Sequence, residues 1–186
     1  MIIGAIITLL PPLPAKLVDL GCGTGWISIF FAKRGYQVTG TDISEDMIYY
    51  TNQNRNKEKK DNLTFTASDF ENMDFKNEYD CAVFYDALHH AEDEKAALRM
   101  TYKALKPSGF RIISEPGKGH SKRAKSIRTT EKYNVTEKDM PLSKIIKTGK
   151  EAGFKKFKVH PPPYPLNLAL YANLDDDMRF LKGYLR

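Results

Sequence analysis

Three alternating glycines follow a short apolar segment and an acidic residue near the start of the chain. In Leu17-Val-Asp-Leu-Gly-Cys-Gly-Thr-Gly-Trp26 the apolar residues have the pattern of a strand buried in a parallel sheet, and an apolar helix follows the glycines. Glycine lets the backbone come close to a ligand, and the first N–H groups of a helix are free to bind one. The segment therefore predicts a cofactor-binding loop beside the carboxylate of Asp19.

The spacing of these glycines distinguishes two classes of cofactor. A dinucleotide-binding loop follows G-x-G-x-x-G/A, in which the third small residue lets the helix pack closely on the strand. Counted from Gly21, that position holds Trp26, whose side chain is too large for such packing. A nicotinamide-dependent oxidoreductase is therefore kept only as the alternative interpretation.

The same residues resemble motif I of the class I S-adenosylmethionine-dependent methyltransferases, whose pattern is acid-x-G-x-G-x-G. Asp19, Gly21, Gly23 and Gly25 match every position. S-adenosylmethionine carries a cationic sulfonium and an ammonium group but no phosphate, so a carboxylate suits it better than a phosphate-binding loop would. The resemblance implies an α/β fold with a single doubly wound, Rossmann-like, mostly parallel sheet, helices on both of its faces, and S-adenosylmethionine as the cofactor.

Two later strands extend the resemblance towards the nucleoside part of the cofactor. The strand over 37–42 ends in Asp42, at the place where the family binds the two ribose hydroxyls with a carboxylate. The strand that starts at Leu63 leads to Asp69 and Phe70, where the family holds the adenine. An Asp after a strand is also a common helix cap or turn former, so a structural role for Asp69 stays open.

The chemical end of the cofactor is expected beside the fourth strand. The segment 79–90 resembles that strand and its trailing loop, which in relatives lies next to the methionine and the reacting methyl group. Local hydrogen bonding is an alternative role for the pair His89 and His90. The segment 105–114 resembles a helix end, a Pro-Gly turn and the fifth strand, so that the match covers roughly residues 15–116.

Carried onto the matching positions, the resemblance gives two sets of site residues. The cofactor-binding residues are expected to be Asp19, Gly21, Cys22, Gly23, Gly25, Trp26, Asp42, Ile43, Asp69, Phe70, Phe84 and Tyr85. The catalytic candidates, for an acceptor hydroxyl whose proton must be removed, are Asp86, His90, Glu115 and His120. Because the sulfonium already activates the methyl group, alignment of the acceptor is the main task and a base is optional. No metal is expected.

Lys, Arg, Gly and Ser dominate the segment that leaves the fifth strand. The residues from Glu115 to Arg128 include too few apolar side chains to pack by themselves, which predicts a mobile substrate-side loop over 115–135. Its positive charge, part of a net charge of +6, favours a small-molecule acceptor that is anionic, and a solvated surface loop is the alternative. Between Glu115 and Thr130 there are no aromatic residues for RNA bases to stack on, so nucleic acid is not expected as a partner.

The length of the chain, 186 residues, suits a single methyltransferase domain over 1–186 with a short N-terminal segment over 1–14. The apolar start of that segment is too short to span a membrane, and a docking strand or helix is expected there. Its shortness, compared with the caps usual in the family, leaves a homodimer and a non-catalytic S-adenosylmethionine-binding domain as alternatives. Two cysteines without C-x-x-C spacing fit a reducing, cytoplasmic location.

Hydrophobic periodicity, with Gly and Pro at the boundaries, predicts strands and helices that alternate along the chain. Strands are expected over 16–20, 37–42, 63–67, from 79, after Gly109 and over 154–160. Helices are expected over 26–33, from Ser44 as N-cap to about residue 60, over 93–105 and 142–152, and in the tail 175–186. Such alternation predicts a parallel sheet whose ligand lies beyond the carboxyl ends of the strands, near the point where the strand order reverses.

Overall fold

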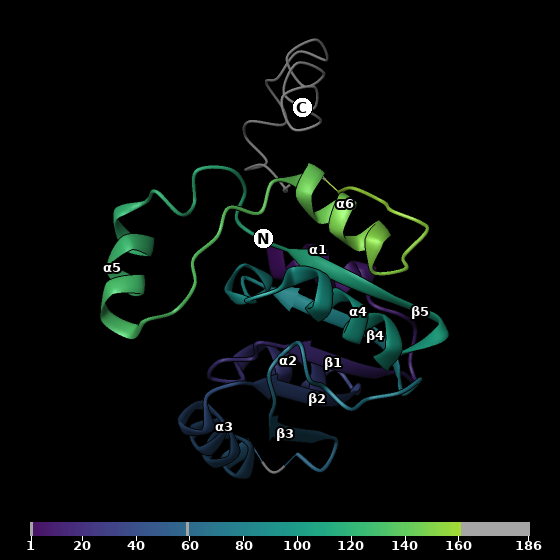
Figure 1. The fold of residues 1–186 in the computed structure, drawn as a ribbon. Coiled ribbons are helices and arrows are strands. Elements are labelled where there is room, and N and C mark those ends of the chain that lie inside the picture. The colour runs from purple at the N-terminus through teal and green to yellow at the C-terminus, as the bar shows by residue number, and fades with distance from the viewer. Residues whose placement is uncertain (1, 59, 161–186) are drawn as a thin grey trace, which may run out of the picture.

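Five parallel strands in the order β3-β2-β1-β4-β5 form the centre of the computed structural model, which describes residues 2–58 and 60–160 (Figure 1). The strands are β1 (Lys16–Leu20), β2 (Gln37–Asp42), β3 (Leu63–Ala67), β4 (Tyr79–Tyr85) and β5 (Leu105–Ser114). The helices are α1 (Ile2–Leu9), α2 (Trp26–Lys33), α3 (Glu45–Glu58), α4 (Glu94–Ala104), α5 (Ala124–Tyr133) and α6 (Leu142–Glu151), with a 3-10 turn η1 (Leu88–His90). The predicted doubly wound α/β fold is confirmed.

Alternation along β1 explains why helices cover both faces of the sheet. Val18 and Leu20 are fully buried in a cluster that includes Leu98 of α4 and residues beside α6. Leu17 points the other way and is fully buried in a second cluster with Ile6 of α1 and Phe31 of α2. A strand that is apolar on both sides belongs in the middle of a parallel sheet, because only there are both of its faces covered.

The strand order reverses at β1, which pairs with β2 on one side and with β4 on the other. The registers Leu20↔Thr41 and Leu20↔Phe84 bring the carboxyl ends of these three strands to the same rim. Loops that leave this rim diverge to opposite faces and open a crevice, which is where open α/β sheets bind ligands.

Several predicted boundaries agree with the structure. The strands over 16–20 and 37–42 and the helix over 26–33 have the expected bounds. Ser44 caps α3, because its Oγ accepts the N–H of Met47 at 3.3 Å. Asp93 caps α4 by accepting the N–H groups of Lys95 and Ala96 at 2.8 and 3.0 Å. The apolar start of the chain is a helix, α1, rather than a strand.

Two predictions about strands are wrong. β5 begins at Leu105, not after Gly109, because Leu105 pairs with Tyr79 and the next residues bulge before Phe110 pairs with Cys81. The segment 154–160 is not a strand. Side chains anchor it instead: the guanidinium of Arg111 stacks 4.0 Å from the ring centroid of Phe154 and donates to the carbonyl of Lys156 at 3.2 Å.

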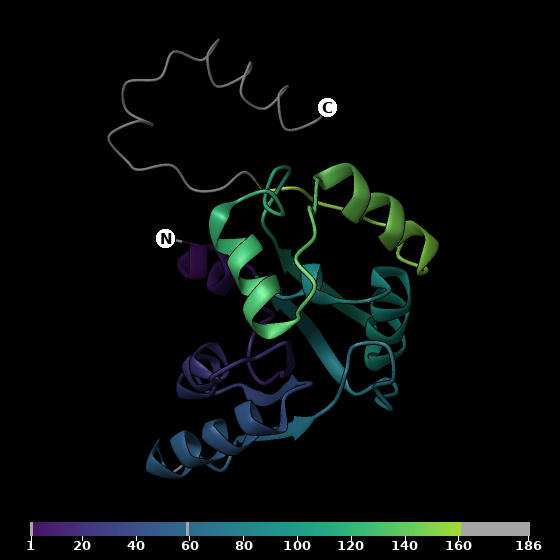
Figure 2. The same cartoon turned by 60° about the vertical axis from the view of Figure 1, so that its left-hand side comes forward.

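The predicted loop over 115–135 contains a helix, α5, which Figures 1 and 2 show as a separate element reached by two long connecting segments. Its residues include neither glycine nor proline, so the helix can form although the flanking residues are rich in breakers. Asn134 ends it in the left-handed conformation, with a φ of 52°. Ser126 is its buried residue, so α5 owes little to core packing.

Helix α6 packs on α4, and the Nζ of Lys144 lies 2.6 Å from a carboxylate oxygen of Glu94. None of the helices in the described residues is long and apolar enough to cross a bilayer. The helix expected in 175–186 lies outside the described residues.

Candidate cofactor and acceptor site

The loop between β1 and α2 needs glycine because of its backbone conformation at all three positions, and because of close neighbours at two of them. Gly21 and Gly25 have φ angles of 75° and 74°, and a Cβ there would come within 2.6 Å of Ala87 and 2.7 Å of the Phe65 ring, respectively. Gly23 also has a positive φ, of 51°, but a Cβ on it would meet nothing within 4 Å. The loop is therefore packed against the protein at its two ends and open at its middle, where its backbone can face a ligand.

Asp42 fixes the middle of this loop from the end of β2. Its Oδ2 accepts the N–H of Gly23 at 2.8 Å, and its Oδ1 accepts the N–H of Ser44 at 3.0 Å. Each carboxylate oxygen can accept a further hydrogen bond. The ribose role expected of Asp42 stays a prediction, and this geometry leaves it the acceptor capacity that the role needs.

Asp19 places a buried carboxyl group beneath the loop. The residue is 2% exposed, and its Oδ2 accepts the hydroxyl of Ser28 at 2.5 Å. Burial raises the pKa of Asp19 to about 6, and the nearby charge of Asp42 adds to the increase, although the Ser28 hydrogen bond opposes it. A cation bound here would favour the ionised form, so the crevice is suited to a positively charged ligand.

A crevice on the rim collects many of the expected residues. It is lined by Asp19, Gly21, Cys22, Gly23, Thr24, Trp26, Ile27, Tyr85 and Asp86. Trp26 is half exposed, and its ring meets that of Tyr85 edge to face at a centroid distance of 6.0 Å. Ile43 is also exposed, at 74%. The crevice thus combines carboxylates, the backbone of the glycine loop and aromatic edges.

Three other expected cofactor residues have visible structural roles. Phe84 is fully buried and does not line this crevice; its ring packs edge to face on Phe70, with centroids 5.5 Å apart. The Phe70 ring in turn lies beside Gly21. Asp69 accepts the N–H of Asn72 at 2.6 Å and its side-chain amide at 2.9 Å, which is the behaviour of a turn former. Contact of Asp69 with the adenine stays a prediction.

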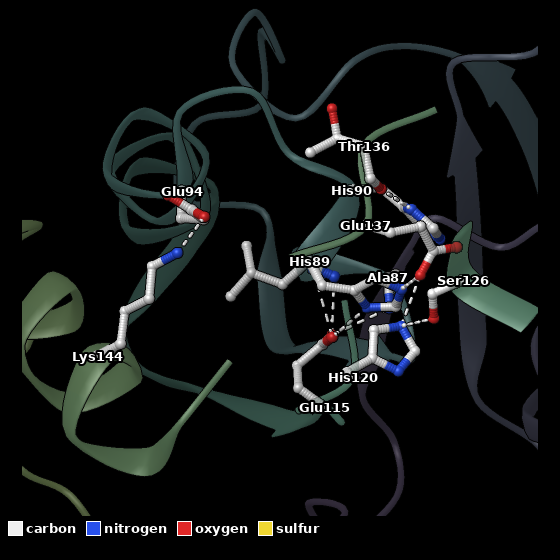
Figure 3. A network of polar contacts seen from close by, with 11 residues as sticks. Ala87, His89, His90, Glu94, Glu115, His120, Ser126, Thr136, Glu137 and Lys144 are labelled. Carbon is white, nitrogen blue, oxygen red and sulfur yellow. Dashed lines mark hydrogen bonds and ion pairs between the residues drawn. The ribbon is translucent and has the colours of Figure 1, made fainter. Parts of the chain in front are cut away.

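Glu115, expected among the catalytic residues, is an anchor at the end of β5 (Figure 3). Its side chain is fully buried, and Oε1 accepts the N–H groups of Ala87 and Leu88 at 3.0 and 2.7 Å. Oε2 lies 3.3 Å from the backbone N and 2.6 Å from the Nδ1 of His89. Such a carboxylate caps η1 and is unavailable to an acceptor molecule.

The imidazole of His89 lies between two acidic residues. Its Nε2 is 3.6 Å from a carboxylate oxygen of Glu137, on the side opposite Glu115. Burial would lower the pKa of His89, but the hydrogen bond and charge of Glu115, together with the charges of Asp86 and Glu137, outweigh burial and raise that pKa. His89 therefore has a local polar role, as the alternative interpretation of the histidine pair expects.

His90 and His120 reach the same group of side chains. The Nδ1 of His90 lies 2.6 Å from the carbonyl oxygen of Thr136, and the Nε2 of His120 lies 2.6 Å from Glu137 and 3.3 Å from the hydroxyl of Ser126. Glu137 was not among the sequence-based candidates. It follows α5 and belongs to no motif, so only the fold reveals that it meets residues almost fifty positions earlier.

Asp86 stands between this polar group and the crevice. It lines the crevice and has a φ of 54°, a left-handed conformation that Asp adopts more readily than most residues. Its N–H donates to the carbonyl of Ser114 at 2.9 Å, which fixes the start of the loop. Of the four catalytic candidates, Asp86 is the one that the structure places on the crevice wall.

The crevice, the strand order and the glycine loop define a class of protein. The model of the methyltransferase domain family matches residues 17–109, half of the chain, and the chain belongs to this family, the class I S-adenosylmethionine-dependent methyltransferases. The nicotinamide alternative is therefore wrong. The residues fit the family's cofactor, because the open middle of the loop admits a backbone contact and the buried Asp19 suits a cation.

Individual relatives agree with this class. The chain is 30% identical over 99 residues to a ubiquinone biosynthesis O-methyltransferase of Hydrogenovibrio crunogenus, which covers 53% of this chain but only 41% of that protein. An S-adenosylmethionine-dependent methyltransferase from Mesorhizobium loti has a similar fold, with a TM-score of 0.74, 21% identity, and 90% and 88% of the two chains covered. Phosphoethanolamine N-methyltransferase 2 of Haemonchus contortus, solved with phosphomonomethylethanolamine and S-adenosylhomocysteine, has a TM-score of 0.70 and 27% identity over 82% of this chain and 36% of that chain.

Proposed function

We propose that this chain transfers the methyl group of S-adenosylmethionine to a small anionic acceptor that binds between the crevice and α5. The observation that carries the proposal is the opposite charge of the two sides. Carboxylates of Asp19, Asp42 and Asp86 surround the rim of the crevice, whereas exposed cationic residues lie on or just before α5: Lys122, Arg123, Lys125, Arg128 and Lys132. A cationic cofactor and an anionic acceptor would each find the charge that favours it.

A relative supports the anionic acceptor. The Haemonchus contortus enzyme was solved with phosphomonomethylethanolamine, a small molecule that carries a phosphate. The basic residues around α5 offer the charge that such a group would need. Phosphorylated or carboxylated small molecules are therefore the acceptors to test first.

In the proposed reaction the protein mainly positions its two ligands. S-adenosylmethionine supplies an activated methyl group when bound. Asp19 and the open part of the glycine loop hold the methionine end, and Asp42 holds the ribose. Tyr85 and Asp86 border the place where the acceptor meets the methyl group, and they orient the acceptor there.

Proton removal, where the acceptor needs it, would fall to residues other than Glu115. Asp86 borders the crevice, and His90 and His120 lie behind it. Of these, only Asp86 lines the crevice and is the proposed base. An amine acceptor that is already deprotonated needs no such base. A hydroxyl acceptor would make the rate depend on Asp86, and the Asp86→Asn variant separates these cases.

Calorimetric titration with S-adenosylmethionine and S-adenosylhomocysteine is the first test of the cofactor site. The Asp42→Ala variant is expected to bind about 5 to 150 times more weakly, the effect of losing roughly 1–3 kcal/mol from charged hydrogen bonds. Unchanged affinity in this variant would contradict the role proposed for Asp42.

Acceptors can then be screened with S-adenosylmethionine labelled in the methyl group, each phosphorylated or carboxylated compound beside its neutral analogue. The double variant Lys125→Glu, Arg128→Glu is expected to raise the KM of an anionic acceptor about 10-fold, equivalent to about 1.4 kcal/mol, with little change in kcat. Lys147→Glu, an exposed lysine of α6, is the matched control. Cofactor binding without transfer to any acceptor would favour the non-catalytic alternative.

A further inference from the structure

Three of the four histidines of the chain gather with Glu137 beside η1 (Figure 3). His89, His90 and Glu137 each offer one ligand atom, and the three atoms lie within 4.8 Å of one another. We propose that these residues form a binding site for a divalent transition-metal ion of the zinc class.

Hydrogen bonding fixes the ring of His89 in the form that binds metals. Its Nδ1 lies 2.6 Å from the carboxylate of Glu115, which also receives three backbone N–H groups and acts as an acceptor. The Nδ1 must therefore carry a proton, and in the neutral ring the lone pair is on Nε2. That atom faces Glu137 at 3.6 Å.

The ring of His90 is oriented in the same way by a different element. Its Nδ1 lies 2.6 Å from the carbonyl oxygen of Thr136, an atom that can only accept. The proton is again on Nδ1, which leaves the lone pair on Nε2. Metal-binding histidines almost always donate their second ring N–H to a carboxylate or a backbone carbonyl, and these two rings show one of each.

The separation of His89 from Glu137 and the burial of both side chains suit a small cation. Metal–ligand bonds of about 2.0–2.2 Å in a tetrahedron place neighbouring ligand atoms roughly 3.3–3.6 Å apart. The 3.6 Å between the Nε2 of His89 and the Oε2 of Glu137 is close to that separation. The side chains of His89 and Glu137 are 3% and 9% exposed, so a cation between them would meet little competition from water.

His120 completes the surroundings of the site. Its Nε2 contacts Glu137 at 2.6 Å and can orient that carboxylate as an outer partner. Its Nδ1 is buried without a hydrogen-bond partner among the described residues. Two imidazoles and a carboxylate suit zinc and neighbouring transition metals, whereas calcium and magnesium prefer oxygen ligands alone.

The ion would join two parts of the chain that are distant in sequence. His89 and His90 belong to η1, beside the crevice, and Glu137 belongs to the segment that returns from α5. A bound ion would hold α5 in place over the acceptor side. The alternative occupant is a proton on the Nε2 of His89 that bridges the ring to Glu137, and metal titration distinguishes the two.

The test uses the full chain, freed of metal by a chelator, with Zn²⁺ in calorimetry and Co²⁺ in visible absorption. The unmodified chain is expected to bind one ion, and Co²⁺ to give the intense visible band of a tetrahedral site. His90→Ala and Glu137→Gln are expected to weaken binding at least tenfold and to remove the band. His160→Ala, which changes the fourth histidine, is the matched control and should bind normally.

Circular dichroism and the unfolding midpoint show whether each variant is folded, and Glu137→Gln keeps the shape of the side chain if His90→Ala does not fold. A folded, unmodified chain that binds no Zn²⁺ overturns the proposal. Binding that survives in both variants, or that is lost in His160→Ala, also overturns it. Because these readouts need neither cofactor nor acceptor, the proposal stands or falls separately from methyl transfer.

Discussion

Replacing Asp19 by Asn tests the electrostatic design of the cofactor loop. Asn has the shape of Asp and can still accept the hydroxyl of Ser28, but it cannot ionise. The pKa of Asp19 is raised from 3.8 to about 6 by burial. Ionisation of Asp19 is therefore less favourable in the folded protein than in the unfolded chain.

The size of the effect on stability follows from the difference between the folded and unfolded pKa of Asp19. Two pH units correspond to about 3 kcal/mol, at 1.36 kcal/mol for each unit. A carboxyl group whose folded pKa is raised contributes its stability fully below pH 3.8, and the contribution is lost as the pH rises through about 6. The free energy of unfolding of the unmodified chain, minus that of Asp19→Asn, should thus fall by about 2–3 kcal/mol between pH 4 and pH 7.

Urea unfolding of both proteins at several pH values measures this difference, and the subtraction removes the other titrating groups that the two share. Calorimetry with S-adenosylmethionine then measures how the affinity for the cofactor depends on pH. The affinity of the unmodified chain should decrease about tenfold for each pH unit below 6, because binding then requires deprotonation of Asp19. Asp19→Asn should bind more weakly and without this dependence.

Asp80→Asn is the control with the opposite sign. Burial would raise the pKa of Asp80, but hydrogen bonds from Lys106 and from the N–H of Lys16 outweigh it and lower that pKa. Its stabilising contribution is present above pH 3.8 and is lost as the pH falls. A difference for Asp19→Asn that is flat with pH, or that rises like that of Asp80→Asn, would refute the reasoning.

Substitutions at four further positions test the packing around the site. Gly25→Ala should cost about 1–3 kcal/mol and weaken cofactor binding, because of its positive φ and the ring of Phe65; thermal unfolding and calorimetry would detect this, and an unchanged protein would contradict it. Glu115→Ala should cost about 3–5 kcal/mol in urea unfolding by leaving buried donors unpaired, and Glu115→Gln less. Trp26→Ala should change stability by under about 0.5 kcal/mol but reduce cofactor affinity, because Trp26 is half exposed on the wall of the crevice. Phe84→Ala should cost about 3–5 kcal/mol, because Phe84 is fully buried. Equal effects of the two substitutions on stability would contradict the assignment of this crevice as the cofactor site.

The cofactor half of the fold could be predicted from the sequence because its determinants are local. Strand β1 is apolar on both sides, and the three glycines and Asp19 follow it without interruption. Family patterns then gave Asp42 its place at the end of β2. The carboxyl ends of parallel strands meet at one edge of the sheet, which brings Asp42 next to the glycine loop.

The polar group around His89 and the segments after β4 and β5 could not be predicted in the same way, because their contacts join distant residues. Glu137 meets His89 and His120 only after α5 has left the sheet and the chain has returned. The bulge of β5 depends on its pairing with Tyr79, and the segment 154–160 depends on Arg111. Each of these outcomes is set by a tertiary partner that periodicity does not reveal.

The buried carboxylate of Glu115 also has a mechanical consequence. It is the first residue after β5, and it holds the backbone of three successive residues in the loop that follows β4. The ends of the two strands are thereby clamped together at one rigid point. A shift of the segment that carries α5 would therefore act through Glu115 on the loop that begins at Asp86, in the wall of the crevice. A ligand that displaces α5 is therefore expected to change the shape of the crevice, and with it the affinity for the cofactor.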